Sequence, residues 1–304
     1  MTLDDLRVFV AVCRAGSLSA VARELSCTQS AVSQHVKRLE KEVGIGLLER
    51  HARGVVPTPA GRILRAAAAD GIGALDHAVR RLGDLARGES GSVRVTTGAT
   101  SVRHFMAAAI VEFRRTHPQV SLEFQTVSSS RGCFEALAAH DLDLAWITMG
   151  APERGIELRP VVELPWVLAV REDDALAAKP FAEPADLKAS ASAQLILPPE
   201  HSTSRAHLDD SFAELGLANG PAAGTGIADW DTAVHLAELG LGHAVVPDLP
   251  GLRHPGHPGL TLLPVPCLPP LQVGWAVRRW SALSPPARAF ADTVGRSCPG
   301  RRAP

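Results

Sequence analysis

The chain has 304 residues, of which 46% are hydrophobic and 21% charged, and its formal net charge is −1. This composition suits two or three compact domains and excludes a disordered or collagen-like chain. No apolar run is long enough to span a bilayer, and five scattered cysteines exclude a disulfide framework and a metal-ligand spacing. No secretory leader is visible at the N-terminus, so we expect a cytoplasmic protein.

The first predicted elements are two helices joined by a tight turn. Ser17 is suited to cap a helix over Leu18–Leu25, and Thr28 a second helix from Gln29 to about Glu42. The second helix has an apolar stripe of Val32, Val36, Leu39 and Val43. Polar side chains suited to base edges and phosphates accompany it, namely Thr28, Gln29, Ser30, Ser33, Gln34, Lys37 and Arg38. A solvated surface helix would use the same residue types, so this face alone leaves both interpretations open.

A β-hairpin is predicted next, from the runs Leu47–Arg50 and Val55–Thr58. Its tip is basic, and Arg53 is the residue we expect on the phosphate backbone. Residues 1–65 hold ten Lys and Arg against six Asp and Glu, so the basic end of the chain coincides with this winged helix-turn-helix.

These residues resemble the signature of the LysR-type transcriptional regulators. The resemblance is carried by Ala15-Gly16-Ser17, Ala22, Leu25, Gln29-Ser30, Val32-Ser33, Leu39-Glu40, Gly44, Leu47, Arg50, Thr58 and Ala60-Gly61. The resemblance extends over the whole chain in its length and its order of elements. It is specific only over about the first sixty residues. One departure is Gln34-His35, where these proteins often have Arg-Gln, which suggests a different set of base contacts.

A long helix is predicted from Pro59. Leu64, Ala68, Gly71, Leu75, Ala78, Leu82 and Leu85 alternate in spacings of four and three, which is typical of a two-helix coiled coil. A helix packed on its own chain is the alternative, which Gly71 and Gly73 keep open. The resemblance implies a dimerising linker helix, and a homodimer that assembles to a homotetramer. Gly88 to Ser92 is the predicted hinge.

Strands and helices then alternate, which predicts a mostly parallel α/β arrangement. Predicted strands cover 93–96, 120–124, 142–147, 166–170, 195–197, 242–246 and 273–277, and predicted helices 102–115, 131–140 and 285–294. The resemblance implies a two-lobed, periplasmic-binding-protein-like effector domain. The expected domains are residues 1–58 (DNA-binding), 59–90 (linker and hinge) and 91–304 (effector), with lobe I at about 91–162 and 267–296 and lobe II at about 163–266.

Two hydroxyl-rich loops follow strands of this domain, Thr97–Ser101 and Ser128–Arg131. Hydroxyls and helix N-termini at strand ends suit a carboxylate or another anion. By resemblance, Thr100, Ser101, Ser128 and Ser129 contact an effector, and His201, Ser202, Thr203 and Ser204 face them from the other lobe. Simple helix capping is the alternative for these hydroxyls.

The sequence therefore predicts a non-enzymatic regulator that binds double-stranded promoter DNA and responds to a small, anionic effector, with RNA polymerase as a possible further partner and no cofactor or metal. One alternative is a regulator whose effector domain binds no metabolite and acts through protein contacts. A cytoplasmic solute-binding protein would leave the first ninety residues unexplained. A cysteine redox sensor would need an exposed thiol with a resolving partner.

Overall fold

The computed structural model describes residues 1–51, 54–86, 91–127, 129–192, 194–217, 225–252 and 259–298. It divides into two compact units, one of Met1–Arg87 with Ala138–Asp141 and one of Gly88–Leu137 with Leu142–Pro304. In the part of the chain that is described, no helix has the length and apolar character needed to cross a membrane.

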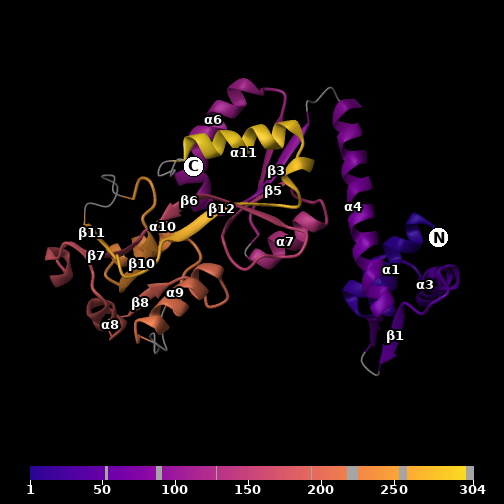
Figure 1. The fold of residues 1–304 in the computed structure, drawn as a ribbon, viewed down its shortest axis with the longest axis horizontal. Coiled ribbons are helices and arrows are strands. Elements are labelled where there is room, and N and C mark those ends of the chain that lie inside the picture. The colour runs from indigo at the N-terminus through magenta and orange to yellow at the C-terminus, as the bar shows by residue number, and fades with distance from the viewer. Residues whose placement is uncertain are drawn as a thin grey trace. The chain divides into compact units, whose positions relative to one another are not determined.

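The N-terminal unit is a helix-turn-helix with a hairpin and a long helix (Figure 1). Its elements are α1 (Leu3–Ala15), α2 (Leu18–Glu24), α3 (Gln29–Val43), β1 (Leu48–His51), β2 (Gly54–Pro57) and α4 (Pro59–Ala86). The predicted caps are present, since Ser17 accepts a hydrogen bond from the amide of Ala20 and Thr28 one from the amide of Ala31. Capped starts and an apolar stripe explain why two short helices form here.

The core of this unit gathers the inner faces of α1, α2 and α3. Phe9, Val12, Val21, Val32 and Leu39 are all buried. Val43, which the sequence places on the same stripe, is 41% exposed because α3 ends there and Gly44 turns the chain into the left-handed conformation.

The hairpin is tied to the helices by backbone groups. Glu40 of α3 accepts hydrogen bonds from the amides of Leu47 and Leu48 at 2.8 and 3.3 Å. The amide of Val55 donates to the carbonyl of Gly16, and a Cβ at Gly54 would lie 2.3 Å from that carbonyl oxygen. Only glycine fits this approach, so the wing is fixed against the turn between α1 and α2. The strands are shifted by one residue from the predicted runs.

The C-terminal unit contains two five-stranded sheets, one in each lobe. The first has the order β4-β3-β5-β12-β6 and the second β11-β7-β10-β8-β9. The first is formed by β3 (Ser92–Thr96), β4 (Ser121–Gln125), β5 (Leu144–Thr148), β6 (Glu157–Leu164) and β12 (Leu271–Val277). The second is formed by β7 (Trp166–Arg171), β8 (Leu195–Leu197), β9 (Thr225–Gly226), β10 (His243–Pro247) and β11 (Leu260–Pro264).

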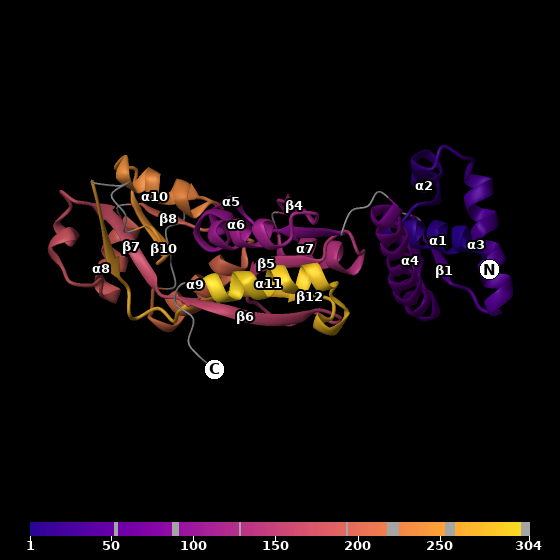
Figure 2. The ribbon, with the colours of Figure 1, turned by 90° about the horizontal axis from the view of Figure 1, so that it is seen from above.

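Helices cover both sheets. Those of the first lobe are α5 (Ala99–Ser101), η1 (Val102–Met106), α6 (Ala107–Thr116), α7 (Ser130–Ala138), η3 (Trp280–Ala282) and α11 (Pro285–Ser297). Those of the second are η2 (Ala175–Ala178), α8 (Pro184–Ser192), α9 (Thr203–Glu214) and α10 (Trp230–Glu238). In the first lobe α6 packs beside α11, where Phe113 meets Phe290 edge to face, and in the second α10 packs over β7, β8 and β10 (Figure 2).

The sheets are mixed, which corrects the prediction of mostly parallel pairing. β3 runs parallel to β4 and β5, but β12 is antiparallel to β5 and β6, and β7 is antiparallel to β10 and β11. The reason is that the chain leaves the first lobe through Pro165 and returns after β11, so β12 enters its sheet from the other lobe. β6, which precedes the first crossing, and β11, which precedes the second, were not predicted as strands, and neither was the short β9.

Candidate DNA interface and effector cleft

The outer face of α3 carries the polar side chains that the sequence predicted for DNA. Thr28, Gln29, Ser30, Gln34 and Lys37 are exposed, and Ser33 is half-buried. Val32, Val36 and Leu39 on the opposite face are buried, which fixes the rotation of the helix. The hydroxyl of Thr28 lies 3.0 Å from that of Ser30 and also caps the helix. The result is one capped helix with a continuous polar face open to solvent.

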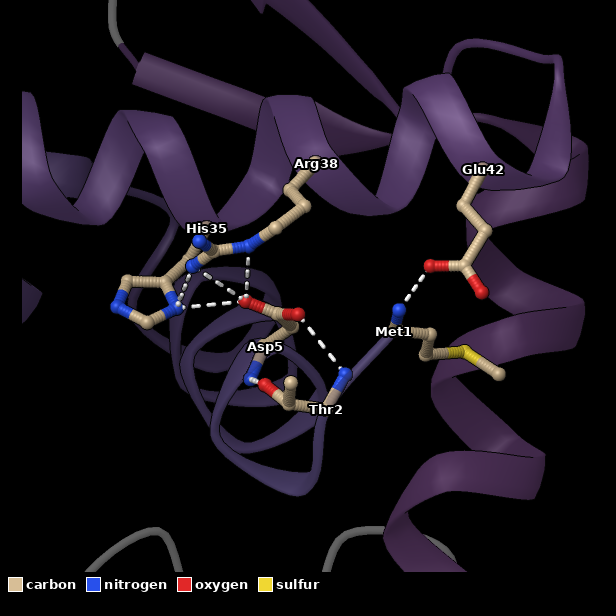
Figure 3. A network of polar contacts seen from close by, with 6 residues as sticks. All are labelled: Met1, Thr2, Asp5, His35, Arg38 and Glu42. Atoms are coloured by element: carbon tan, nitrogen blue, oxygen red, sulfur yellow. Dashed lines mark hydrogen bonds and ion pairs between the residues drawn. The ribbon is translucent and has the colours of Figure 1, made fainter.

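Arg38 and His35 are held by a buried carboxylate from α1 (Figure 3). Asp5 Oδ1 accepts from Arg38 Nε at 2.9 Å and lies 2.8 Å from His35 Nδ1. Its other oxygen accepts from the amide of Thr2, which closes a capping box at the start of α1. Figure 3 also shows the N-terminal amine paired with Glu42. The side chain of Arg38 stays 54% exposed, whereas that of His35 is 29% exposed and turned toward Asp5.

This network changes the interpretation of Gln34-His35. The sequence attributed that pair to base contacts, but in the structure Gln34 is exposed while His35 is half-buried and joins α3 to α1. Arg53, the predicted phosphate contact of the wing, lies outside the described residues.

A cavity of about 310 Å³ lies between the two lobes of the C-terminal unit. Its lining comes from the loop before α5, from η1, β5 and β12 on one side and from the starts of α9 and α10 on the other. Strand ends and helix starts meet here, as in other open α/β sheets. The position agrees with the cleft that the sequence predicts.

Most of the predicted effector residues line this cavity. Those that do are Thr100, Ser101, Ser129, His201, Ser202 and Ser204. Thr203 does not line it, and its hydroxyl lies 2.8 Å from that of Ser130. Ser128 lies outside the described residues. Ser129 and Ser202 also accept hydrogen bonds from the amides of Gly132 and Arg205 at 3.1 Å, so the capping alternative is realised at both.

Asp229 is a lining residue that the sequence analysis missed. It caps α10, accepting from the amide of Thr232 at 2.9 Å, and its other oxygen accepts from the hydroxyl of Thr100 at 2.6 Å. Burial opposes its ionisation, but the hydrogen bonds from Thr100 and Thr232 and the nearby His104 outweigh this and lower the pKa of Asp229. An Asp directly before an apolar helix, with Ala233, Val234 and Ala237 buried, was the available signal.

Aromatic side chains form much of the remaining wall. Phe105, Trp146 and Trp230 all line the cavity. Phe105 and Trp146 have ring centroids 5.6 Å apart, and Trp230 meets Trp166 edge to face. The cleft is therefore apolar on its walls and polar at the strand ends, which is the usual character of small-molecule sites.

The two lobes touch through polar side chains around this cavity. His104 of η1 lies between Asp231 Oδ1, 2.7 Å from its Nε2, and the carbonyl of Pro250 at its Nδ1. Thr148 and Ser204 have hydroxyls 3.1 Å apart. The helix predicted over 102–115 begins earlier in the structure, at Ala99. It includes a π-helical turn, which is a feature frequent at functional sites.

The cysteines do not form a redox pair in the described structure. No disulfide joins them, and burial raises the pKa of Cys13 and Cys298 to about 11 and also raises that of Cys133 and Cys267. Raised values disfavour the reactive thiolate. Among the described residues no cluster of three or more His, Cys, Asp and Glu is placed to hold a metal ion.

Both units of the chain match known protein families. Residues 3–62 match the family "Bacterial regulatory helix-turn-helix protein, lysR family", and residues 86–299 match "LysR substrate binding domain". The chain is 26% identical over 298 residues to the uncharacterized HTH-type transcriptional regulator YbhD of Escherichia coli (strain K12), covering 95% of this chain and 89% of that one. It is 31% identical over 204 residues to the HTH-type transcriptional regulator BudR of Raoultella terrigena, covering 66% and 69%.

Solved structures share the fold. The crystal structure of CbnR, a LysR family transcriptional regulator, superposes with a TM-score of 0.60 at 21% identity and covers 98% of this chain and 99% of that one. Full-length CbnR in complex with its target DNA gives a TM-score of 0.59, also at 21% identity, with 98% and 100% covered.

Proposed function

The chain belongs to the LysR family of transcriptional regulators, and on that premise we propose that α3 reads specific promoter DNA under the control of a small molecule in the interlobe cleft. It is a DNA-binding regulator with an effector-binding domain and not an enzyme. The observation that carries the proposal is the face of α3, which is polar, capped and open to solvent while its opposite face is buried.

The DNA contacts divide by chemistry. Gln29, Ser30, Ser33 and Gln34 have the donors and acceptors that read base edges. Thr28, Lys37 and Arg38 would contact phosphates, with Arg38 oriented by Asp5, and Arg53 would extend the contact along the wing. Such a protein would work in the cytoplasm, on chromosomal DNA. A contact with RNA polymerase belongs to this proposal as the route by which bound protein changes transcription.

Self-association is supported by the second half of α4. Leu75, Val79 and Leu82 are 53%, 66% and 64% exposed on one face of that helix. Large apolar side chains in such a row are typical of a helix–helix interface. We propose a dimer through this face, since paired half-sites on DNA call for two-fold symmetry, and its assembly to a tetramer.

The cleft would hold the effector. A ligand that binds one arrangement of the lobes better than another shifts the equilibrium toward it and so changes DNA binding. Thr100, Ser101, Ser129, His201 and Ser202 line the cavity from both lobes and support this assignment. On the same grounds we propose that residues 1–58 bind DNA, that residues 59–90 form the linker and hinge, and that residues 91–304 bind the effector. The sequence predicts an anionic ligand here because hydroxyls and helix starts surround the cleft. The carboxylate of Asp229 argues against an anion.

The test compares a DNA fragment from upstream of the protein's own gene with random DNA of equal length. Replacing Ser33 or Gln34 by Ala should reduce the preference for the specific fragment by about 1–3 kcal/mol. Lys37→Ala and Arg53→Ala should weaken both DNAs alike and lower the salt slope by about one unit.

Fluorescence anisotropy at several salt concentrations measures both quantities. Lys188→Ala is the matched control, because Lys188 is exposed in the effector domain. Equal losses on specific and random DNA for Ser33→Ala and Gln34→Ala would remove α3 from base readout.

A further inference from the structure

We infer that the cleft selects an organic cation, whose charged nitrogen pairs with Asp229 and whose apolar part lies against Phe105, Trp146 and Trp230. This inference rests on the proposed function, because it names the chemical class of the effector for the same cleft. It departs from the anion that the sequence predicts.

The charge of the lining is the first support. Among the described residues that line the cavity, Asp229 is the one carboxylate, His201 is the one imidazole, and none is Lys or Arg. His104 and Arg103 both pair with Asp231, at 2.7 and 3.7 Å, and His104 acts on Asp229 through space without pairing with it. Asp229 makes no ion pair with any residue in the described part of the chain. A cationic ligand would supply the missing countercharge.

The hydrogen bonds around Asp229 are the second support. Three donors, the amide and hydroxyl of Thr232 and the hydroxyl of Thr100, point at its two oxygens. The lowered pKa of Asp229 means that the carboxylate is ionised at neutral pH. The carboxylate also occupies the N-terminus of α10, where an anionic ligand would otherwise bind. An anion would therefore meet a fixed negative charge at this end of the cavity.

The aromatic wall is the third support. Phe105, Trp146 and Trp230 give the apolar part of a cationic ligand a surface to bury, as aromatic walls do in other small-molecule sites. The volume of about 310 Å³ is at the small end of the range for ligand sites, which favours a compact ligand with one charged nitrogen.

The experiment titrates the full-length protein with benzylammonium, benzoate and benzyl alcohol, which share a ring and differ in charge. Quenching of tryptophan fluorescence and thermal unfolding both report binding. We expect benzylammonium to bind in the millimolar range and at least about tenfold more tightly than benzoate. Asp229→Asn should lower its affinity about tenfold or more, because it removes a charge-assisted hydrogen bond. Asn also caps helices, so α10 keeps its start.

Asp292→Asn is the control, since Asp292 is exposed on α11 and its loss changes the net charge equally. Tighter binding of benzoate or benzyl alcohol, or benzylammonium binding that survives Asp229→Asn, would overturn the cation inference and leave the effector cleft standing. If none of the three binds at about 10 mM, the effector cleft itself is overturned together with the inference.

Discussion

Asp5 shows how one buried residue links the fold of the N-terminal unit to Arg38, a proposed DNA contact. Its side chain is fully buried between α1 and α3 and meets Arg38, His35 and the amide of Thr2. Burial alone would favour the neutral acid, but hydrogen bonds from these three partners outweigh it and hold the pKa of Asp5 far below its usual range. The carboxylate thus orients the guanidinium of Arg38. The free energy needed to remove the charged carboxylate from water is offset by the hydrogen bonds of its partners.

Asp5→Asn should destabilise the N-terminal unit by about 2–3 kcal/mol at neutral pH. This loss of stability is smaller than the loss expected when a fully buried ion pair is broken, because the side chain of Arg38 is half exposed. Since the folded pKa is lowered, the stability from Asp5 is present above the unfolded carboxyl pKa of about 3.9 and is lost as the pH falls toward the folded value. Hydrogen exchange of peptides from residues 1–62, measured from pH 7 downward, checks both parts. Asp4→Asn, a neighbouring exposed carboxylate, should leave exchange nearly unchanged, and an equal effect of the two variants would contradict the assignment.

At the scale of elements, α4 divides into two halves with different partners. Leu64 packs against the cluster of Phe9, Leu39 and Leu47, and Ala68 is buried. Leu75 and Leu82 continue the same seam but are exposed. The first half of the predicted seam therefore packs on its own unit, as the single-chain alternative required, and the second half is available to another molecule. The side chain of Leu85 lies outside the described residues.

Leu75→Lys should dissociate the proposed dimer, because it places a charge in an apolar helix interface. Sedimentation at micromolar concentration would show a lower mass for this variant than for the parent chain. Ala66→Lys adds the same side chain to an exposed position half a turn around the helix and should keep the parent mass. An unchanged mass for Leu75→Lys would place self-association on another surface.

At the scale of the effector domain, the contacts that join the lobes also surround the cleft. Thr100 meets Asp229, Ser130 meets Thr203, and His207 Nε2 lies 2.7 Å from the carbonyl of Met149. A ligand in the cavity would touch Thr100 and Asp229 of this set, so we expect its binding energy to act on the lobe arrangement. His104, with a side chain only 5% exposed, is an enclosed bridging group that meets a carboxylate.

His104→Ala should lower the stability of the effector domain by about 1–3 kcal/mol and loosen the lobes. It leaves Asp231 and the carbonyl of Pro250 without their shared partner. Thermal unfolding measures the loss, and hydrogen exchange at the start of α10 measures the loosening. His235→Ala, at an exposed position of α10 with a side chain 59% exposed, should change neither. Unaltered exchange in His104→Ala would mean that the lobes are held by the other contacts.

The sequence by itself determined the local elements of this protein and its family. Ser17 and Thr28 predicted the starts of two helices, and the stripe of Val32, Val36 and Leu39 predicted the inner face of α3. The alternation of strands and helices indicated the α/β domain. These features depend on neighbours within a few residues, where propensity, capping and periodicity are strongest. The hydroxyl-rich loops after two strands pointed to Thr100, Ser101 and Ser129, and the family resemblance pointed to His201, Ser202 and Ser204, all of which line the cleft.

Tertiary structure alone decided which distant residues meet. Thr100 and Asp229 are 129 positions apart, and Asp5 and Arg38 are 33 apart, so no local pattern predicts either contact. The family resemblance implied crossings between the lobes near residues 162 and 266, but the mixed strand directions that result from them were decided by the tertiary structure. The same holds for the charge of the cleft, because the sequence places hydroxyls near a ligand but only the tertiary structure brings Asp229, at the start of α10, next to Thr100 of α5.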